Sequence, residues 1–400
     1  MENWFKLVYG WGYDKAQPAQ AAAAVPQNSA DPFVACAAGD DQALHRAMHE
    51  DGEWYNQPGG TLGMPPLIAV TFSSLVQLPE YAPGLYRCCQ RLLYRGADPN
   101  QTWIDPAFPT SPLSALYGAA GRNHSVDITR LLLDAGANPN DNESLYHSVE
   151  SRDLGCTRLL LEHGAVVTGT NALFRVLDFD NLEGLRLLLE HGGDAKERDG
   201  LALHHAIRRR RSMAQIETLL AAGADPSAPG KDGLTPFVRA MLNGLPEIAA
   251  RLETPGASQS LTVAQQFVAA CARADRDAAM AIARANPEIV ASLSEDELRQ
   301  LPNLASAGAS EAVRVMVELG WPIDVAGGDW QASALNHAVF RGDAQLTRFL
   351  LDHGASWTTK QGYGGNVVGT LGYASRNEPV PGGDWAACAD VLKEHGVPVV

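Results

Sequence analysis

One phrase recurs throughout the chain, and its clearest copy is Arg130-Leu131-Leu132-Leu133-Asp134-Ala135-Gly136-Ala137-Asn138-Pro139-Asn140. A leucine-rich helix end is followed by a glycine, and the same ending returns around Gly96, Gly164, Gly192, Gly223 and Gly354. Glycine suits the end of a helix because the next backbone position is left-handed, where a Cβ costs about 1 kcal/mol or more. The phrase therefore predicts a series of short helices that each end at a glycine.

A second anchor, usually a leucine or phenylalanine that opens an apolar stretch, precedes each closing position. Seven pairs are 19 residues apart: Phe33 and Gly52, Leu145 and Gly164, Leu173 and Gly192, Phe237 and Gly256, Phe267 and Asn286, Leu301 and Gly320, Leu335 and Gly354. Four further pairs are 20 to 29 residues apart: Leu203 and Gly223, Leu113 and Gly136, Leu371 and Gly396, Leu67 and Gly96. Regular spacing of this kind predicts eleven repeated units, some with inserted residues.

Each unit has the pattern of two short amphipathic helices. In the unit that begins at Leu335, apolar or small residues fall at offsets 0, 3 and 4 and again at 11, 12, 15 and 16, with Gly342 at the break. Helices of about two turns are marginal in water, so neither could bury its apolar stripe alone. The units are therefore expected to stack against their neighbours.

The phrase Thr235-Pro236-Phe237 before one helix, together with the Leu-Leu-x-x-Gly-Ala-Asp type of ending, resembles the ankyrin repeat family. The resemblance implies an all-α fold, an ankyrin-type helical-hairpin solenoid of about eleven repeats over residues 32–400. Some connectors are truncated, such as the nine residues from Gly136 to Leu145 and from Gly164 to Leu173, and others are extended.

Residues 1–31 form a separate N-terminal part. Five aromatic residues occupy its start, and residues 17–26 have the Ala/Gln/Pro composition of a low-complexity linker. The aromatic residues are Trp4, Phe5, Tyr9, Trp11 and Tyr13. Two interpretations are open: the segment folds back to cap the apolar end of the first unit, or it docks on a partner or a membrane surface.

Composition narrows the class of protein. Hydrophobic residues make up 46% of the chain, and no run of about 18 apolar residues predicts a membrane span. The net charge of −15 disfavours a nucleic acid partner. An acidic start without an apolar core disfavours a secretory signal, so a cytoplasmic location is expected. Arginine outnumbers lysine 25 to 6, which is typical of a high-GC bacterial source.

The cysteines and most of the histidines occupy positions in the repeated unit where a structural role is expected. All six cysteines occupy apolar positions of the unit. Four histidines directly precede a closing glycine, where the helix dipole favours positive charge: His163, His191, His353 and His395. His204 matches a structural histidine of the family, which leaves its neighbour His205 to face outward. No metal-binding, nucleophile or phosphate-loop motif is present, so neither a cofactor nor enzyme activity is expected.

Candidate partner-binding residues come from two sources. By the geometry that the resemblance implies, certain first-helix positions face a concave surface: His147, Glu150, Arg175, Asp178, His205, Arg208, Arg209, Arg239, Asn243, Phe340 and Arg341. The long connectors carry aromatic residues, and aromatic residues on exposed loops are typical binding hot spots: Trp54, Trp103, Trp330, Trp357 and Tyr363. Trp321 also lies in a connector but is not included among the predicted site residues. The run from Arg208 to Arg211 fits either a solvated face or an acidic site on a partner.

These observations predict a non-catalytic scaffold that binds another protein. Among bacterial proteins of the family, one role that the resemblance implies is an intracellular inhibitor or immunity-type protein that occludes a toxin or effector enzyme. The alternative is a secreted, host-directed effector that recruits a host protein, with residues 1–31 as its delivery segment. Enzyme activity is a remote further alternative.

Overall fold

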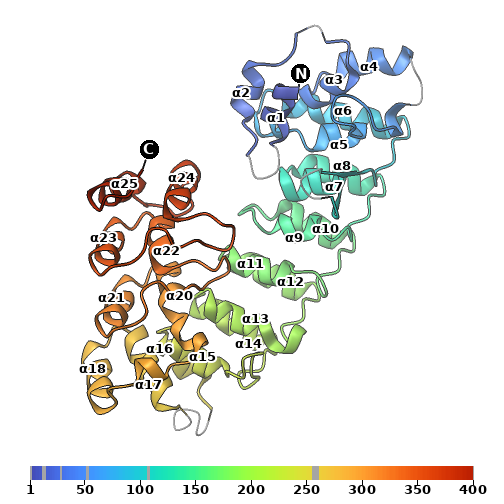
Figure 1. The fold of residues 1–400 in the computed structure, drawn as a ribbon. Helices are drawn as coiled ribbons and strands as arrows, with labels where there is room; N and C mark the ends of the chain where they lie inside the picture. The colour runs from blue at the N-terminus through green and yellow to red at the C-terminus, as the bar shows by residue number, and fades with distance from the viewer. Residues whose placement is uncertain are drawn as a thin grey trace. The chain divides into compact units, whose positions relative to one another are not determined.

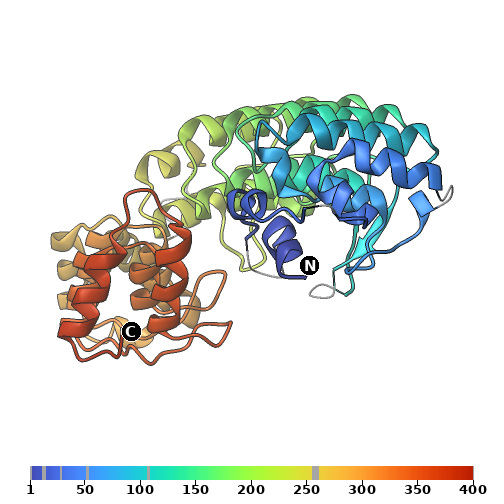
Figure 2. The ribbon, with the colours of Figure 1, turned by 90° about the horizontal axis from the view of Figure 1, so that it is seen from above.

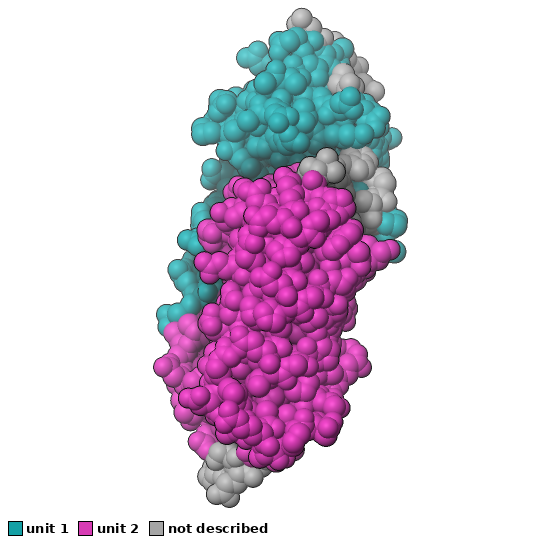
Figure 3. All heavy atoms as spheres, turned by 60° about the vertical axis from the view of Figure 1, so that its left-hand side comes forward, with its two compact units in different colours: residues 1–197 teal, residues 198–400 magenta. Residues whose placement is uncertain are grey.

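The computed structural model describes residues 2–10, 15–27, 29–50, 54–105, 109–254 and 261–399. Most of them form short helices, which pair as antiparallel hairpins (Figure 1). The chain divides into two compact units, residues 1–197 as unit 1 and residues 198–400 as unit 2, which Figure 3 colours separately. Eleven helical hairpins occur among the described residues, as the spacing of the anchors predicts, and a further helix pair precedes them.

Unit 1 contains an N-terminal helix pair and five hairpins. The N-terminal pair is α1 (Glu2–Tyr9) and α2 (Pro18–Ala23). The hairpins are α3 (Pro32–Ala38) with α4 (Asp41–Glu50), α5 (Pro66–Thr71) with α6 (Ala82–Tyr94), α7 (Ala115–Tyr117) and the π-helical turn η3 (Gly118–Arg122) with α8 (Val126–Asp134), α9 (Ser144–Ser148) with α10 (Gly155–Glu162), and α11 (Ala172–Asp178) with α12 (Leu182–Glu190). Two short 3-10 helices, η1 (Trp54–Asn56) and η2 (Ser74–Gln77), lie between them.

Unit 2 contains six hairpins. They are α13 (Glu197–Arg208) with α14 (Met213–Ala221), α15 (Pro236–Leu242) with α16 (Pro246–Leu252), α17 (Val263–Ala272) with α18 (Arg276–Ala285), α20 (Gln300–Ser306) with α21 (Ser310–Glu318), α22 (Ala334–Phe340) with α23 (Ala344–Asp352), and α24 (Val367–Asn377) with α25 (Trp385–Glu394). The 3-10 turn η5 (Val290–Ser292) and the short helix α19 (Glu295–Leu298) precede α20. Residues 198–200 of α13 have left-handed backbone angles, so its regular helix starts after Gly200.

The predicted anchors form the core, and the predicted glycines end the second helices. The anchors from Leu145 to Leu335 in the 19- and 20-residue pairs are all buried, whereas Phe33 is only half-buried. The closing glycines have φ between 74° and 96°: Gly96, Gly136, Gly164, Gly192, Gly223, Gly320, Gly354 and Gly396. Asn286 instead has a φ of −135° and ends its helix without a left-handed turn. Gly52 and Gly256 lie outside the described residues.

Asparagine side chains join successive hairpins of unit 1. Asn140 Nδ2 donates to the carbonyl oxygen of the closing Gly164 at 3.1 Å, and its Oδ1 accepts from the backbone N–H of Val166 at 2.8 Å. Asn100 makes the same two bonds one repeat earlier, to Gly136 and Asn138, at 3.4 and 2.7 Å. Each pair of asparagine hydrogen bonds satisfies backbone groups that the end of a helix leaves without intrahelical partners. Hydrogen bonds therefore supplement apolar packing in fixing the stack.

The connectors differ in length and structure, as expected. The long connector before α7 holds a two-stranded antiparallel ribbon of β1 (Thr102–Ile104) and β2 (Pro112–Ser114). Single antiparallel bridges join Gly59 to Met64 and Gly327 to Ala332. The two nine-residue connectors lead directly into α9 and α11 without strands.

The third repeat begins later than the sequence pattern predicts. Leu113 was expected to open its first helix, but it lies in β2 and is half-buried. The helix starts after Ser114, whose hydroxyl accepts from the backbone N–H of Tyr117 at 2.8 Å, and Leu116 is the buried residue. The 23-residue spacing therefore reflects a connector that extends three residues further, with a spacing of 20 from Leu116 to Gly136.

The N-terminal aromatic segment folds back onto unit 1 (Figure 2). Trp4, Phe5 and Tyr9 of α1 are buried, and the Tyr9 hydroxyl donates to the carbonyl oxygen of Ala69 in α5 at 2.9 Å. Residues expected to form a linker instead contain α2, which packs on α1 and η2. Trp4 Nε1 donates to the Ala21 carbonyl oxygen at 2.9 Å and so joins the two helices. Trp11 and Tyr13 lie outside the described residues.

Candidate functional site

The first helices of successive hairpins in unit 1, α5, α7, α9 and α11, lie side by side. We call the surface that they form the first-helix face. Five charged residues gather on this face and form the charged cluster: Glu143, His147, Glu150, Arg175 and Asp178. They come from α9, from the residues that flank it, and from the neighbouring α11. Their side chains are between 21 and 33% exposed, so the cluster is accessible but partly shielded from water.

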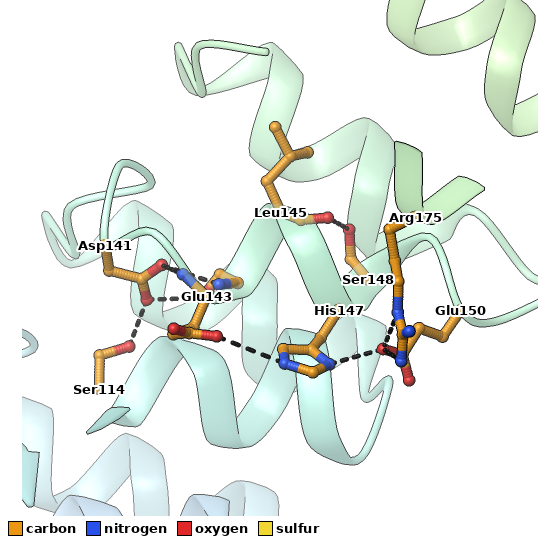
Figure 4. Close-up of polar contacts among 9 residues, drawn as sticks. Ser114, Asp141, Glu143, Leu145, His147, Ser148, Glu150 and Arg175 are labelled. Atoms are coloured by element: carbon orange, nitrogen blue, oxygen red, sulfur yellow. Dashed lines mark hydrogen bonds and ion pairs between the residues drawn. The ribbon is translucent and has the colours of Figure 1, made fainter. Parts of the chain in front are cut away.

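His147 lies between two carboxylates (Figure 4). Its Nε2 is 3.3 Å from Glu143 and its Nδ1 is 2.6 Å from Glu150. Burial opposes the charged imidazolium, but the hydrogen bonds to Glu143 and Glu150 outweigh it and raise the pKa of His147 to about 9. The imidazole is therefore positively charged at neutral pH.

Arg175 extends the same network into the next repeat. Its Nε and Nη2 donate to Glu150 Oε1 at 2.8 and 2.7 Å, and its Nη1 lies 3.9 Å from Asp178. Burial raises the pKa of Glu150, yet His147 and Arg175 together lower it below its ordinary value. Glu150 thus remains ionised and links α9 to α11 by charge-assisted hydrogen bonds.

Local hydrogen bonds fix α9 in the position that presents His147 (Figure 4). Asp141 accepts from the backbone N–H and the hydroxyl of Ser144 at 2.8 and 2.6 Å, and it also accepts from the Ser114 hydroxyl of the preceding repeat. At the other end of α9, Ser148 Oγ donates to the Leu145 carbonyl oxygen at 3.0 Å. Asp141 therefore ties the start of the short helix to the preceding repeat, and Ser148 closes its last turn.

Aromatic rings surround the charged cluster. Tyr117 and Tyr146 present ring edges to His147 at centroid distances of 5.2 and 4.7 Å. The Arg175 guanidinium lies over the rings of Tyr146 and Phe179 at 5.2 and 4.7 Å, and Phe179 is 44% exposed. Ordered arginine and aromatic groups of this kind are enriched at the energetic centres of protein interfaces.

Four of the predicted site residues come together in the charged cluster: His147, Glu150, Arg175 and Asp178. The prediction used offsets 2, 5 and 6 from the anchor of each first helix. This rule omitted Glu143, which precedes α9, and Tyr146, which lies one residue after the anchor. Phe179 satisfies the rule as offset 6 from Leu173, so the sequence contained a usable signal for it. Tyr117 lies one residue after Leu116, the corrected anchor of the third repeat, and is omitted for the same reason as Tyr146.

Two predicted site residues of unit 2, Trp330 and Phe340, lie in a second, aromatic group. Trp330 contacts His337 at 4.6 Å and Phe340 at 5.2 Å between centroids, and Phe340 stacks on the half-exposed Tyr373 at 6.3 Å. Burial lowers the pKa of His337 to about 4, so this histidine is neutral. Tyr363, in the following connector, is 79% exposed.

The arginines from Arg208 to Arg211 are not equally exposed, and some of them make contacts within the chain. Arg208 is exposed, Arg209 forms an ion pair with Asp329 at 2.6 Å, and Arg210 donates to the Asn243 carbonyl oxygen. The expectation that His205 faces outward is wrong, because it is only 8% exposed and its Nδ1 lies 3.0 Å from Arg208 Nη2.

Three other predicted residues of unit 2 have structural contacts. Arg239 donates to Asp232 at 2.7 and 2.8 Å and to His204 Nδ1 at 2.8 Å. Asn243 is 8% exposed, and its side chain donates to the Arg239 carbonyl oxygen at 2.8 Å. Arg341 Nη1 donates to the Ser306 carbonyl oxygen at 3.0 Å. Much of their hydrogen-bonding capacity is therefore used within the chain.

The connector tryptophans pack locally. Trp54 lies edge-on to Phe33 at 5.5 Å and Trp103 lies edge-on to Phe72 at 6.3 Å, and both are half-buried, as is Trp357. Trp321 is 3% exposed, and its Nε1 donates to the Leu298 carbonyl oxygen at 2.9 Å. Trp54, Trp103 and Trp321 therefore use part of their indole surface within the chain.

Buried thiols and helix-end histidines match their predicted structural positions. All six cysteines are buried and unpaired in disulfides. The Nδ1 atoms of His163, His191, His353 and His395 lie 2.8 or 2.9 Å from the carbonyl oxygen four residues earlier. Across the described ranges, no group of three or more His, Cys, Asp or Glu residues could hold a metal ion. None of the described helices has both the length and the apolar character that crossing a membrane requires.

These features define a repeat protein of stacked helical hairpins with a preformed polar and aromatic face. Residues 81–171, which include η3, α9 and α10, match the family model of ankyrin repeats in three copies. This segment of the chain is therefore similar to ankyrin repeats.

One similar solved structure is the human ASB11 ankyrin repeat domain, with 18% sequence identity and a TM-score of 0.44 over 56% of this chain and 98% of that chain. No curated protein matches the sequence.

Proposed function

We propose that this chain is a non-catalytic inhibitor that binds another protein through the first-helix face of unit 1 and occludes it. The charged cluster is the observation that carries the proposal. Its five ionisable groups are held in fixed geometry by bonds within the chain, so a partner would not have to order them. The exposed Phe179 ring beside Arg175 adds an apolar contact to the charged ones.

The chemistry of the face favours a protein as the partner. Two cations and three carboxylates alternate within the charged cluster, a pattern that complements a surface carrying both signs of charge. A phosphate backbone would meet the three carboxylates as well as the two cations. We assign the inhibitor to the bacterial cytoplasm and its partner to the toxins or effector enzymes, as an immunity-type protein.

A host-directed effector is the alternative within the same class of scaffold. In that role residues 1–31 would act as a delivery segment and would have to be available to an export machinery. Trp4, Phe5 and Tyr9 are instead buried in unit 1, so they would first have to detach. A reporter fused after residue 400 distinguishes the roles, because its appearance in host cells would contradict the inhibitor assignment.

Site-specific crosslinking tests the proposal. A photoreactive benzoyl-phenylalanine placed at Phe179 should form a covalent adduct with one protein in the producing cells. The same group at Arg186, an exposed position of α12 in the same hairpin, serves as the control. Adducts at both positions, or at Arg186 alone, would contradict binding through the first-helix face.

A further inference from the structure

The second helices of unit 1 carry a basic pocket that is separate from the charged cluster. It lies between α4 and α6, which pack against each other, and has a volume of about 450 Å³. One wall consists of Arg87 and Arg91 of α6 and of Arg95, which directly follows that helix, and His45 and Met48 of α4 line the other wall. Figure 1 shows these two helices near the N-terminal end of the array.

Intramolecular contacts hold the arginines but use few of their donors. Asp41, whose side chain is 14% exposed, lies 3.1 Å from Arg87 Nε and 3.2 Å from Arg91 Nη2. Arg95 Nη2 donates to the Met48 carbonyl oxygen at 2.9 Å. Arg91 Nη1 also lies 3.3 Å from His45 Nδ1. Each guanidinium has five N–H donors, so several donors of Arg87 and Arg95 are not used in these contacts. Three cations face one carboxylate, which concentrates positive charge in a chain of net charge −15.

The spacing of the arginines indicates the form of the ligand. Arg87, Arg91 and Arg95 follow one another at intervals of four residues, which places them on one face of α6 about 6 Å apart. Side chains on one face of an extended strand repeat at about 6.6–6.8 Å. Three carboxylates at alternate positions of an extended peptide could therefore each meet one guanidinium, while a single small anion would engage only part of the row.

We infer that the pocket between α4 and α6 binds an extended acidic peptide segment of a partner protein, with carboxylates at every second residue opposite Arg87, Arg91 and Arg95. Tyr94, which lines the pocket and is 90% exposed, offers an apolar contact to the intervening residues. The site belongs to the second helices and does not depend on the function proposed for the first-helix face.

Calorimetric titration of the full chain tests this inference. The probe is an eight-residue peptide of alternating glutamate and serine, and the same peptide with glutamine for glutamate is its control. The glutamate peptide should bind at least tenfold more tightly than the control, and its affinity should fall as salt is added. Equal binding of the two peptides, or no binding of either, would overturn the inference.

Matched variants locate the binding. Arg87→Gln with Arg95→Gln should weaken the glutamate peptide at least tenfold, whereas Arg158→Gln, which removes an exposed arginine from α10, should leave it unchanged. The Arg87→Lys and Arg95→Lys pair keeps the charge and should show an intermediate loss, provided that circular dichroism shows both double variants folded. Unchanged affinity in the folded glutamine variant would contradict the site. Binding of pyrophosphate in place of the peptide would assign the pocket to a free anion instead.

Discussion

His147 owes its charge to the carboxylates on either side of it. Its pKa of about 9 in the folded chain lies above the value of about 6.5 for a free imidazole, so protonation stabilises the fold. This contribution is complete below pH ~6.5 and is lost as the pH rises through 9. Unit 1 should therefore become less stable over that range, and with it the orientation of Glu150.

We predict that His147 titrates near pH 9 in imidazole NMR spectra of the full chain. His337 serves as an internal contrast, because its pKa of about 4 keeps it neutral throughout pH 6–9. His147→Gln should destabilise unit 1 by about 1–3 kcal/mol at pH 6 and by much less at pH 9.5. Titration of His147 near pH 6.5 would show that the two carboxylates do not hold the proton.

Leu188 tests the apolar half of the repeat at the same scale. The side chain is fully buried in α12, and Leu188→Ala should cost about 2–5 kcal/mol because it leaves a cavity between helices. Val166→Ala, at a 57% exposed position, should cost far less. Thermal unfolding compares the two, and equal midpoints would mean that the assigned register of the repeat is incorrect.

The N-terminal helix α1 acts as an element of unit 1. Its aromatic side chains are buried, and burial of one large apolar side chain contributes about 1.5–3 kcal/mol. Removal of residues 2–24 should therefore increase amide exchange in α5, which accepts the Tyr9 hydrogen bond, and leave α22 unaffected. Unchanged protection of α5 in hydrogen-exchange mass spectrometry would show that α1 does not stabilise the hairpins.

Element boundaries could be predicted where the repeat had its standard length. The anchors at Leu145, Leu173 and Leu335 and their closing glycines locate helices correctly because each unit is one hairpin with few inserted residues. The predicted start of the third repeat was wrong because strand β2 of the inserted ribbon contains a leucine, Leu113. Apolar spacing alone cannot distinguish Leu113 from Leu116. Ser114, as the helix N-cap, was the local signal that separates them.

Helix α2 was missed for a different physical reason. Alanine has the highest helix propensity, so an alanine-rich segment forms a helix readily once a surface such as α1 and η2 is available. The same composition is typical of linkers. Only the burial of Ala21 beneath Trp4, a tertiary contact, decides between the two.

At the scale of the molecule, the sequence identified four of the five residues of the charged cluster but not the contacts between them. The offsets placed His147, Glu150 and Arg175 on one face, but whether they bind one another depends on distances between repeats. The ion pair of Arg209 with Asp329 joins residues 120 positions apart, which no local pattern predicts. The arginine run consequently offers Arg208 as its exposed member, and a partner contact in unit 2 remains a prediction.

The most direct test of the account is a charge exchange in the cluster, measured as affinity for the protein that crosslinks at Phe179. Glu150→Arg with Arg175→Glu reverses both charges but keeps an opposite pair between α9 and α11. The exposed pair of Arg158 and Glu183, 2.7 Å apart on second helices, provides the matched exchange as control. We predict at least a tenfold loss of affinity, about 1.4 kcal/mol, for the first exchange and none for the second. Equal affinities of the two folded variants would contradict binding through the first-helix face.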